Sequence, residues 1–218
     1  MIRCFAVILI SLIGLSTSSV AQDPALAHQS IDKIEKTSLS YGLVVDNSGS
    51  FRTILDKVID AVSDVVEENR DDDEAFLMTF VDTPKVVLRQ EFTYKKSELH
   101  DAAQNMFIEG GQTAILDAVK GAANYLDENA KTEEGRGRAL LLVTDGEDRG
   151  SETKIEDVLK ILKGKNIRVF IIAMSDGKVF TKLLDRLTKE TGGRIVTPKN
   201  RADIAAAAKQ ISAAMRTK

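Results

Sequence analysis

From Leu39 onward, the sequence alternates short apolar runs with longer stretches in which apolar residues recur every three or four positions. Apolar runs of about four to eight residues are typical of buried strands, and the longer period is typical of amphipathic helices. Strand and helix patterns that alternate in this way favour a mostly parallel sheet covered by helices on both faces. The sequence therefore predicts an α/β fold with a doubly wound, mostly parallel six-stranded sheet.

Six segments carry the strand pattern: 41–45, 75–81, 85–92, 139–143, 169–173 and 194–197. The turn Asp82-Thr83-Pro84 joins the second segment to the third and predicts a hairpin, so 85–92 should be the one antiparallel edge strand. The near-continuous apolar run at 139–143 predicts a central strand that is covered on both faces.

About six helices are expected between and after these strands. Ser151 is a candidate N-cap for the helix around 155–162, and Gly164 is a candidate stop for it. Gly192 and Gly193 should end the following helix. The acidic run at 71–74 is interpreted as a solvated turn before a strand, because no ring of ligands for a calcium ion surrounds it.

The first 21 residues resemble a cleaved signal peptide. Arg3 precedes an apolar run of 12 residues, and Ser19-Val20-Ala21 offers the small-x-small pattern of a cleavage site. The alternative is an uncleaved anchor, but the run is shorter than the roughly 20 apolar residues that a membrane span needs. We expect a mature protein that begins at Gln22, is secreted or periplasmic, and has no stable membrane insertion. Its polar N-terminal arm would cover 22–38 and its domain 39–218.

Charge and composition argue against several functions. The net charge of -3 argues against nucleic acid as a partner, because nucleic-acid-binding proteins normally carry a basic excess. Aromatic residues make up only 5% of the chain and Trp is absent, which leaves few platforms for stacking sugars or bases. The only histidines, His28 and His100, leave little for a histidine-based zinc or catalytic site.

Three polar clusters follow predicted strands or open predicted helices. Asp46, Ser48 and Ser50 follow the first strand, Thr113 follows the glycine pair Gly110-Gly111, and Asp145 follows the central strand. Ligands of doubly wound sheets bind at the carboxyl ends of strands. The candidate ligands therefore offer two carboxylates and three hydroxyls. Hard cations prefer such oxygens, so the sequence predicts a Mg²⁺ site, with Mn²⁺ or Ca²⁺ as alternatives.

Two carboxylates at close range would repel each other and raise one pKa in the absence of a cation. A divalent ion would neutralise them, and one of its coordination positions would remain open for an acidic group of a partner. Simple capping of a helix by Ser48 and Ser50 is the structural alternative. The segment 147–149 is interpreted as a solvated loop at the rim rather than as ligands, and the two glycines as structural.

These elements resemble the metal-ion-dependent adhesion site of von Willebrand factor type A domains and integrin inserted domains. The motif Asp46-Asn47-Ser48-Gly49-Ser50, the distant Thr113 and the Thr144-Asp145-Gly146 turn occur in the family's order. The resemblance extends over residues 39 to about 216 and is closest to secreted bacterial members with a segment like Thr191-Gly192-Gly193-Arg194. It implies that Ser48, Ser50 and Thr113 coordinate the ion, with Asp46 and Asp145 as direct or outer-sphere anchors. It also implies a protein partner that offers an acidic side chain.

Two other functions compete with a binding module. A Mg²⁺-dependent hydrolase on the same scaffold would need a second acid two residues after Asp46, where the sequence has Ser48, and no P-loop follows the first strand. A serine-hydrolase elbow is also absent, and nothing supplies a general base. We therefore expect a protein that is not an enzyme. A structural subunit with a vestigial metal site is the third alternative.

Overall fold

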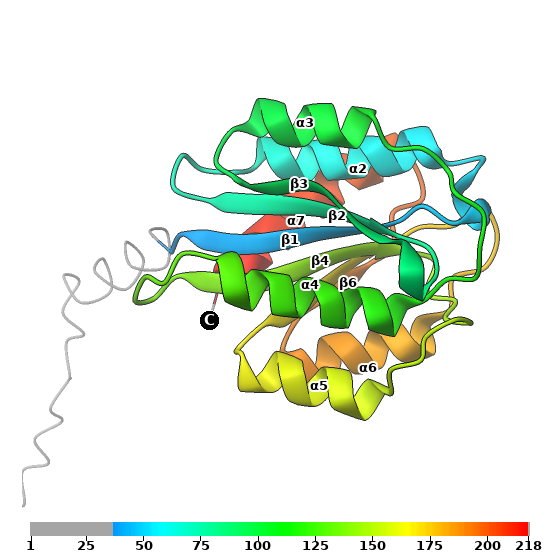
Figure 1. The fold of residues 1–218 in the computed structure, drawn as a ribbon. Helices are drawn as coiled ribbons and strands as arrows, with labels where there is room; N and C mark the ends of the chain where they lie inside the picture. The colour runs from blue at the N-terminus through cyan, green and yellow to red at the C-terminus, as the bar shows by residue number, and fades with distance from the viewer. Residues whose placement is uncertain (1–36, 218) are drawn as a thin grey trace, which may run out of the picture.

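A computed structural model describes residues 37–217 and contains a six-stranded sheet between two layers of helices (Figure 1). The predicted signal peptide and nearly all of the predicted arm lie outside the described residues. The end of that arm is part of the domain, because the carbonyl oxygen of Ser38 accepts a hydrogen bond of 2.8 Å from the amide of Gly137.

The sheet has the strand order β3-β2-β1-β4-β5-β6. Neighbouring strands are parallel except for β2 and β3, which form the predicted antiparallel pair at one edge. The predicted mostly parallel, six-stranded sheet is therefore confirmed. The strand bounds are β1 Leu39–Asp46, β2 Glu74–Phe80, β3 Val86–Thr93, β4 Gly137–Thr144, β5 Arg168–Ala173 and β6 Ile195–Val196.

Helices cover both faces of the sheet (Figure 1). One apolar layer includes residues of α2, α3 and α7, and the other includes residues of α4, α5 and α6. Their bounds are α2 Leu55–Glu67, α3 Lys96–Gln104, α4 Ile115–Asn129, α5 Ile155–Gly164, α6 Thr181–Thr191 and α7 Arg201–Arg216. Short 3-10 turns, η1 Gly49–Phe51 and η2 Thr83–Lys85, follow β1 and β2.

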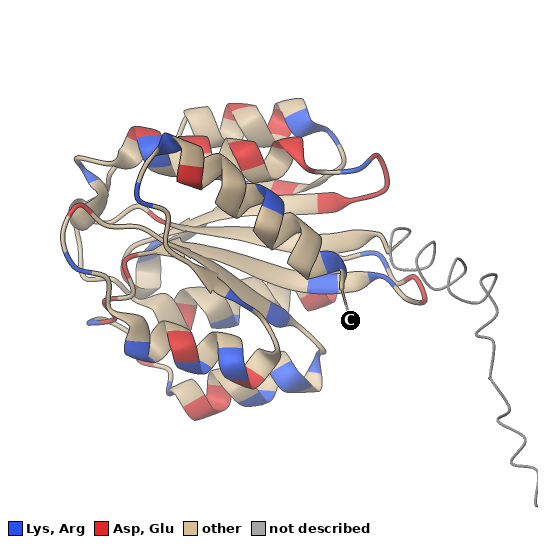
Figure 2. Ribbon diagram, turned by 180° about the vertical axis from the view of Figure 1, so that it is seen from behind, with Lys and Arg blue, Asp and Glu red and all other residues tan. Residues whose placement is uncertain are grey.

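The two apolar layers explain why the central strands carry such continuous apolar runs. In β1, Leu43 and Val45 face the layer of α2, α3 and α7, whereas Val44 faces the opposite layer. Successive side chains of a strand point to opposite faces, so a strand covered on both sides needs apolar residues at every position. Charged residues of both signs are distributed over the helices, and the central strands carry few of them (Figure 2).

The order of the strands places β1 at the topological switch point. From β1 the chain crosses one face through α2 to reach β2, and after β3 it returns through α4 to β4 on the other side of β1. The loops that follow β1 and β4 therefore diverge to opposite faces, which is where such sheets bind ligands.

One predicted helix cap is wrong, and two predicted helix stops agree with the structure. Ser151 does not cap α5, which begins without a side-chain cap; its hydroxyl accepts a hydrogen bond of 2.9 Å from the amide of Leu116 at the start of α4. Gly164 is the last residue of α5, so the helix ends where the sequence predicts, and Asn166 shortly after it is left-handed with φ of 53°. Gly192 ends α6 with φ of 74°, as expected.

Only the first half of the acidic run at 71–74 is solvated, although the sequence predicts a solvated turn over the whole run. Asp71 and Asp72 are exposed, but Asp73 and Glu74 are buried. Asp73 forms a bidentate pair with Arg216 of α7, with nitrogen-to-oxygen distances of 2.5 and 3.1 Å, and also accepts the backbone amides of Leu39 and Arg70.

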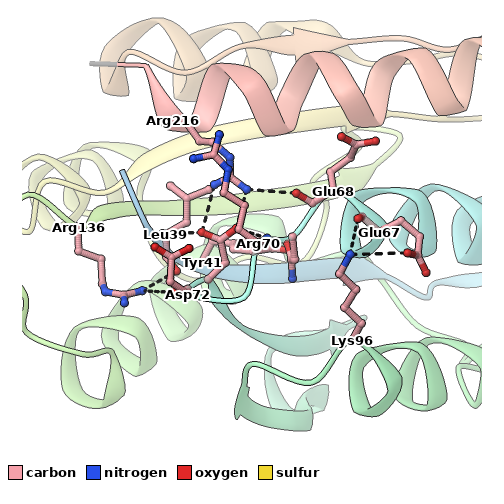
Figure 3. Close-up of polar contacts among 11 residues, drawn as sticks. Leu39, Tyr41, Glu67, Glu68, Arg70, Asp72, Lys96, Arg136 and Arg216 are labelled. Carbon is pink, nitrogen blue, oxygen red and sulfur yellow. Dashed lines mark hydrogen bonds and ion pairs between the residues drawn. The ribbon is translucent and has the colours of Figure 1, made fainter. Parts of the chain in front are cut away.

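Other polar contacts surround this pair (Figure 3). The Arg216 guanidinium also donates to the carbonyl oxygen of Glu68, and Arg136 donates to the carbonyl oxygens of Leu39 and Asp72. The contacts join the end of α7 to the beginning of β1 and to the turn before β2. They lie at the amino ends of the parallel strands, at the opposite end of the sheet from the carboxyl ends.

None of the helices in residues 37–217 is long and apolar enough to cross a membrane.

Candidate metal centre

Asp46 and Asp145 lie at the ends of adjacent parallel strands. Val45 pairs with Val143 in the register of β1 and β4, so Asp46, the last residue of β1, lies beside Thr144. The Thr144 hydroxyl donates a hydrogen bond of 2.8 Å to Asp46 Oδ2. Both carboxylate residues are buried, Asp46 fully and Asp145 with 5% of its surface exposed. The structure therefore places the two predicted carboxylates side by side at the switch point.

The loop after β1 arranges two of the predicted hydroxyls. Asp46 Oδ1 accepts a hydrogen bond of 3.0 Å from the amide of Ser48, and the hydroxyls of Ser48 and Ser50 are 3.1 Å apart. Ser48 precedes η1, but its side chain makes no capping hydrogen bond, and the residue before α2 is Ile54. Helix capping therefore does not account for the two serines.

The third loop holds Thr113, which is 8% exposed. The carbonyl oxygen of Thr113 accepts hydrogen bonds from the amides of Arg149 at 2.9 Å and Gly150 at 3.0 Å. These bonds fix the Thr113 loop to the loop that follows β4. The Thr113 hydroxyl itself forms no hydrogen bond to the other four predicted ligands, so the structure joins its loop to the loop after β4 through the backbone alone.

Gly111 shows why a glycine is needed before Thr113. A Cβ at this position would lie 2.6 Å from Val81 Cγ1 and 2.7 Å from Asp82 Oδ2, at a φ of 156°. Both atoms belong to the segment that follows β2, so the loop can approach the strand ends only without a side chain. Gly110 has open space around it and is not restricted in this way.

Asn47 is a positioning residue to which the sequence pattern assigns no role. Its amide donates to the carbonyl oxygen of Phe80 at 3.1 Å, its side-chain Nδ2 donates to that of Phe107 at 3.0 Å, and its own carbonyl oxygen accepts the amide of Glu109 at 2.9 Å. Asn47 thus holds the loop after β1 against both β2 and the Thr113 loop. A polar residue between two candidate ligand positions gives no pattern from which these long-range contacts could be read.

Thr144 is a second residue of the centre that lies outside the predicted ligand set. Besides donating to Asp46, its hydroxyl accepts a hydrogen bond of 3.1 Å from the amide of Gly146. A polar residue directly after the apolar run at 139–143 is the signal that could have identified it. Its hydroxyl orients the Asp46 carboxylate and shapes the turn that carries Asp145.

Two hydrogen bonds and a glycine determine the shape of the turn after β4. Asp145 Oδ1 accepts the amide of Glu147 at 2.9 Å, and the carbonyl oxygen of Asp145 accepts the amide of Phe180 at 2.7 Å. Gly146 has φ of 85°, and any Cβ there would overlap the carbonyl oxygen of Phe180. The glycine of the Thr-Asp-Gly sequence is therefore required by both conformation and space.

The segment 147–149 is not simply a solvated rim. Asp148 is half-buried, and its Oδ1 accepts hydrogen bonds from the amide of Ile115 at 3.2 Å and the hydroxyl of Ser151 at 2.7 Å. Asp148 and Ser151 together satisfy amides at the beginning of α4, directly after Thr113. Glu147 and Arg149 form a more exposed ion pair, with 2.6 Å between their charged atoms.

Burial destabilises the charged form of Asp46. Loss of water raises the pKa of this carboxyl from its ordinary 3.8 to about 7, against the lowering effect of hydrogen bonds from Ser48 and Thr144. The neighbouring Asp145 carboxylate adds a smaller upward contribution. Repulsion between the two acids, which was expected from the sequence to raise one pKa, is therefore present, but desolvation is the main cause.

The donor set fits a hard divalent cation. Asp145 Oδ2 and Thr113 Oγ1 accept no hydrogen bond from residues 37–217, and each oxygen of Asp46 accepts one bond from a neighbouring donor. Within those residues there is no cluster of three or more His, Cys, Asp or Glu side chains that could hold an ion. An ion at this centre would have to be bound by two carboxylates, neutral hydroxyls and water, as Mg²⁺ often is.

Comparisons with solved structures support the fold. The structure of the conserved hypothetical protein BatB from Bacteroides thetaiotaomicron is 18% identical, with a TM-score of 0.64, and the match covers 79% of this chain and 98% of that one. An aerotolerance-related membrane protein from Bacteroides fragilis, solved with multiple mutations to serines, is 19% identical with a TM-score of 0.65, over 80% of this chain and 98% of that one.

A von Willebrand factor type A structure from Catenulispora acidiphila is 16% identical, with a TM-score of 0.69, over 82% of this chain and 43% of that one. No curated protein matches the sequence. The model of the von Willebrand factor type A domain matches residues 42–210, from within β1 to within α7. With more than half of its length matched by that model, this chain belongs to the von Willebrand factor type A domain family.

Proposed function

We propose that this protein is an exported, metal-dependent binding module rather than an enzyme. A divalent cation at the strand ends would accept a carboxylate from a partner protein. The residues that would hold the ion are Asp46, Ser48, Ser50, Thr113 and Asp145.

The observation that carries this proposal is the buried carboxyl of Asp46. Desolvation raises its pKa to about 7, and the carboxylate of Asp145 lies close enough to raise it further. A bound cation would stabilise the ionised form of both acids at neutral pH. The neighbouring Asp145, and Thr113 in a loop that is hydrogen-bonded to the loop after β4, keep side-chain acceptor oxygens that a cation could use.

The number of charges supports binding of a partner's acid. Two carboxylates would roughly neutralise a divalent ion, and the neutral hydroxyls would fill further positions without adding charge. Mg²⁺ is the first choice because it retains water ligands and uses few carboxylates. Mn²⁺ or Ca²⁺ would also accept this all-oxygen set.

A hydrolase is the main alternative, and the described residues give it little support. The position two residues after Asp46 is Ser48, which leaves no second acid for a phosphatase of the haloacid dehalogenase type. The one histidine in the range 37–217, His100, contacts Glu67 of α2 rather than a residue of the centre. Burial raises the pKa of Asp46 to about 7, but both of its oxygens already accept hydrogen bonds, from the Ser48 amide and the Thr144 hydroxyl.

Export is part of the proposal and rests on the N-terminal sequence. The apolar run that follows Arg3 and the Ser19-Val20-Ala21 pattern favour a cleaved signal peptide. The Bacteroides fragilis structure is described as that of a membrane protein, which supports a role for such domains at the cell envelope. Net negative charge and the mixed charges in Figure 2 favour a protein partner over nucleic acid.

Isothermal titration with Mg²⁺ and Mn²⁺ tests the metal site. Asp145→Ala removes a charge and a lone pair, so it should weaken ion binding more than Thr113→Ala, which removes only a neutral oxygen. Glu147→Ala is the matched control, because it deletes an acid of the same loop whose side chain pairs with Arg149. Ion affinity of both test variants equal to that of the parent would place the site elsewhere. Normal ion binding without any partner would instead favour a vestigial site.

A further inference from the structure

A cavity of about 550 Å³ lies directly beside the turn that carries Asp145. It is lined by Gly146 and Asp148 of that turn, by Ile155 of α5, and by residues 178–183 and 186 at the beginning of α6. The hydrogen bond of 2.7 Å from the amide of Phe180 to the carbonyl oxygen of Asp145 joins the two regions. The cavity therefore begins at Gly146, the residue that follows the candidate ligand Asp145.

The floor of this cavity is apolar. Ile155, Val179, Phe180 and Leu183 line it and are all half-buried. Ile155, Val179 and Leu183 pack from outside against the apolar layer of α4, α5 and α6. Part of their surface remains free, so a small apolar side chain entering the cavity would bury hydrophobic surface on both sides.

The rim of the cavity is positively charged, although the chain as a whole is acidic. Lys178, Lys182 and Arg186 line it and are exposed, against one acid, Asp148, whose Oδ1 already accepts two hydrogen bonds. Arg186 pairs with Glu156 at 3.1 Å, but Lys178 and Lys182 form no ion pair within residues 37–217. Lys178 lies over the Phe180 ring instead, at 4.9 Å from its centroid.

We propose that this cavity, defined by Ile155, Val179, Phe180 and Leu183 with its rim of Lys178, Lys182 and Arg186, binds an acidic–apolar segment of the partner protein. The inference rests on the proposed function, because it assumes that a carboxylate of the same segment binds the cation. An apolar side chain near that carboxylate enters the cavity, and a second acidic side chain meets the two unpaired lysines. The complementary charges and the position of the cavity next to Asp145 select this occupant.

The charge of the rim would act on specificity and on the rate of association. Exposed ion pairs contribute little affinity each, but a cluster of one sign attracts an acidic segment and disfavours a basic one. The metal by itself would accept any accessible carboxylate. The cavity would therefore select, among acidic proteins, those with an apolar residue beside the acid.

A random peptide library displayed on phage provides the probe. It is selected on the immobilised full chain in Mg²⁺, and in parallel with chelator present. In Mg²⁺, we expect enrichment of peptides that contain an acidic residue, an apolar residue beside it, and a second acidic residue. No enrichment in Mg²⁺, or enrichment of peptides without an apolar residue, would overturn the inference.

Charge reversal then tests the contact directly with the best selected peptide. The double variant Lys178→Glu/Lys182→Glu should bind this peptide at least about tenfold more weakly in fluorescence anisotropy, while titration shows Mg²⁺ affinity no weaker than that of the parent. Replacing the second acid of the peptide by lysine should restore much of the affinity lost in the double variant. Lys209→Glu, an equal charge change on the exposed side of α7, is the matched control and should have no effect.

The two proposals fail in different ways. Peptides that bind equally well with chelator would refute the metal-dependent function. Peptides that need Mg²⁺ but bind the double variant as tightly as the parent would refute the cavity and leave the metal-dependent function standing.

Discussion

Replacing Asp46 by Asn should remove a loss of stability that the metal-free parent shows as the pH rises. Asp46 ionises at about pH 7 when folded and has an ordinary pKa of 3.8. A raised folded pKa stabilises the protein fully below the unfolded value, and this stabilisation is lost as the pH rises through the folded value. The parent should therefore lose stability between pH 5 and pH 8, because the buried carboxyl must ionise.

The size of the effect follows from the same values. At pH 5 the folded carboxyl is about two pH units below its pKa, whereas the unfolded one is already ionised. At about 1.4 kcal/mol for each unit, this contributes about 3 kcal/mol of stability at pH 5 that has disappeared by pH 8. Asp46→Asn does not titrate, so its stability relative to the parent should rise by about that amount over the same interval.

Urea denaturation at the two pH values, with metal-stripped protein and chelator-treated buffer, measures this difference. Asp71→Asn, which removes an exposed acid from the turn before β2, controls for the loss of one negative charge. An equal free-energy difference between parent and Asp46→Asn at pH 5 and pH 8 would refute the argument that burial destabilises the ionised form. In saturating Mg²⁺ at pH 8, the parent should be more stable than Asp46→Asn, because only the carboxylate binds the ion well.

Three further predictions concern the fold. Removing the ion with chelator should lower the melting temperature by a few degrees and leave a cooperative transition, because the apolar layers lie apart from the three loops. An ion present at 100 times its Kd contributes about 2.7 kcal/mol to stability. Complete unfolding on chelation would mean that the ion is structural. Arg216→Met should destabilise the protein by about 3–5 kcal/mol in urea denaturation, because it leaves the buried Asp73 without its ion-pair partner. The control Arg201→Met, at the exposed start of α7, should have little effect. Equal losses of stability in the two variants would contradict this reasoning. Gly193→Ala should lower the free energy of unfolding by about 1–3 kcal/mol, because its Cβ would overlap the carbonyl oxygen of Val169. Gly164→Ala, at a position with open space around it, should be neutral or stabilising. Similar melting temperatures for the two variants would disprove the overlap.

The sequence alone determined the sheet, its layers and the order of the three clusters. Apolar runs in β1 and β4 predict strands covered on both faces, because a side chain on either side of such a strand is removed from water. The alternation of strand and helix patterns then restricts the connections to a few topologies. Because the carboxyl ends of parallel strands lie at one edge of a sheet, the positions of Asp46 and Asp145 in the sequence are enough to predict that they lie together.

Tertiary structure alone decided how those residues are held and which neighbours matter. Ser151 and Asp148 satisfy amides of α4, a helix that begins more than thirty residues earlier in the chain, and Asp73 pairs with Arg216 from the other end of the domain. Such contacts depend on which loops meet in space, and helix propensity or apolar period carries no information about that. The pKa of Asp46 likewise depends on burial by residues distant in sequence, because desolvation is a property of the assembled strand ends and not of the motif.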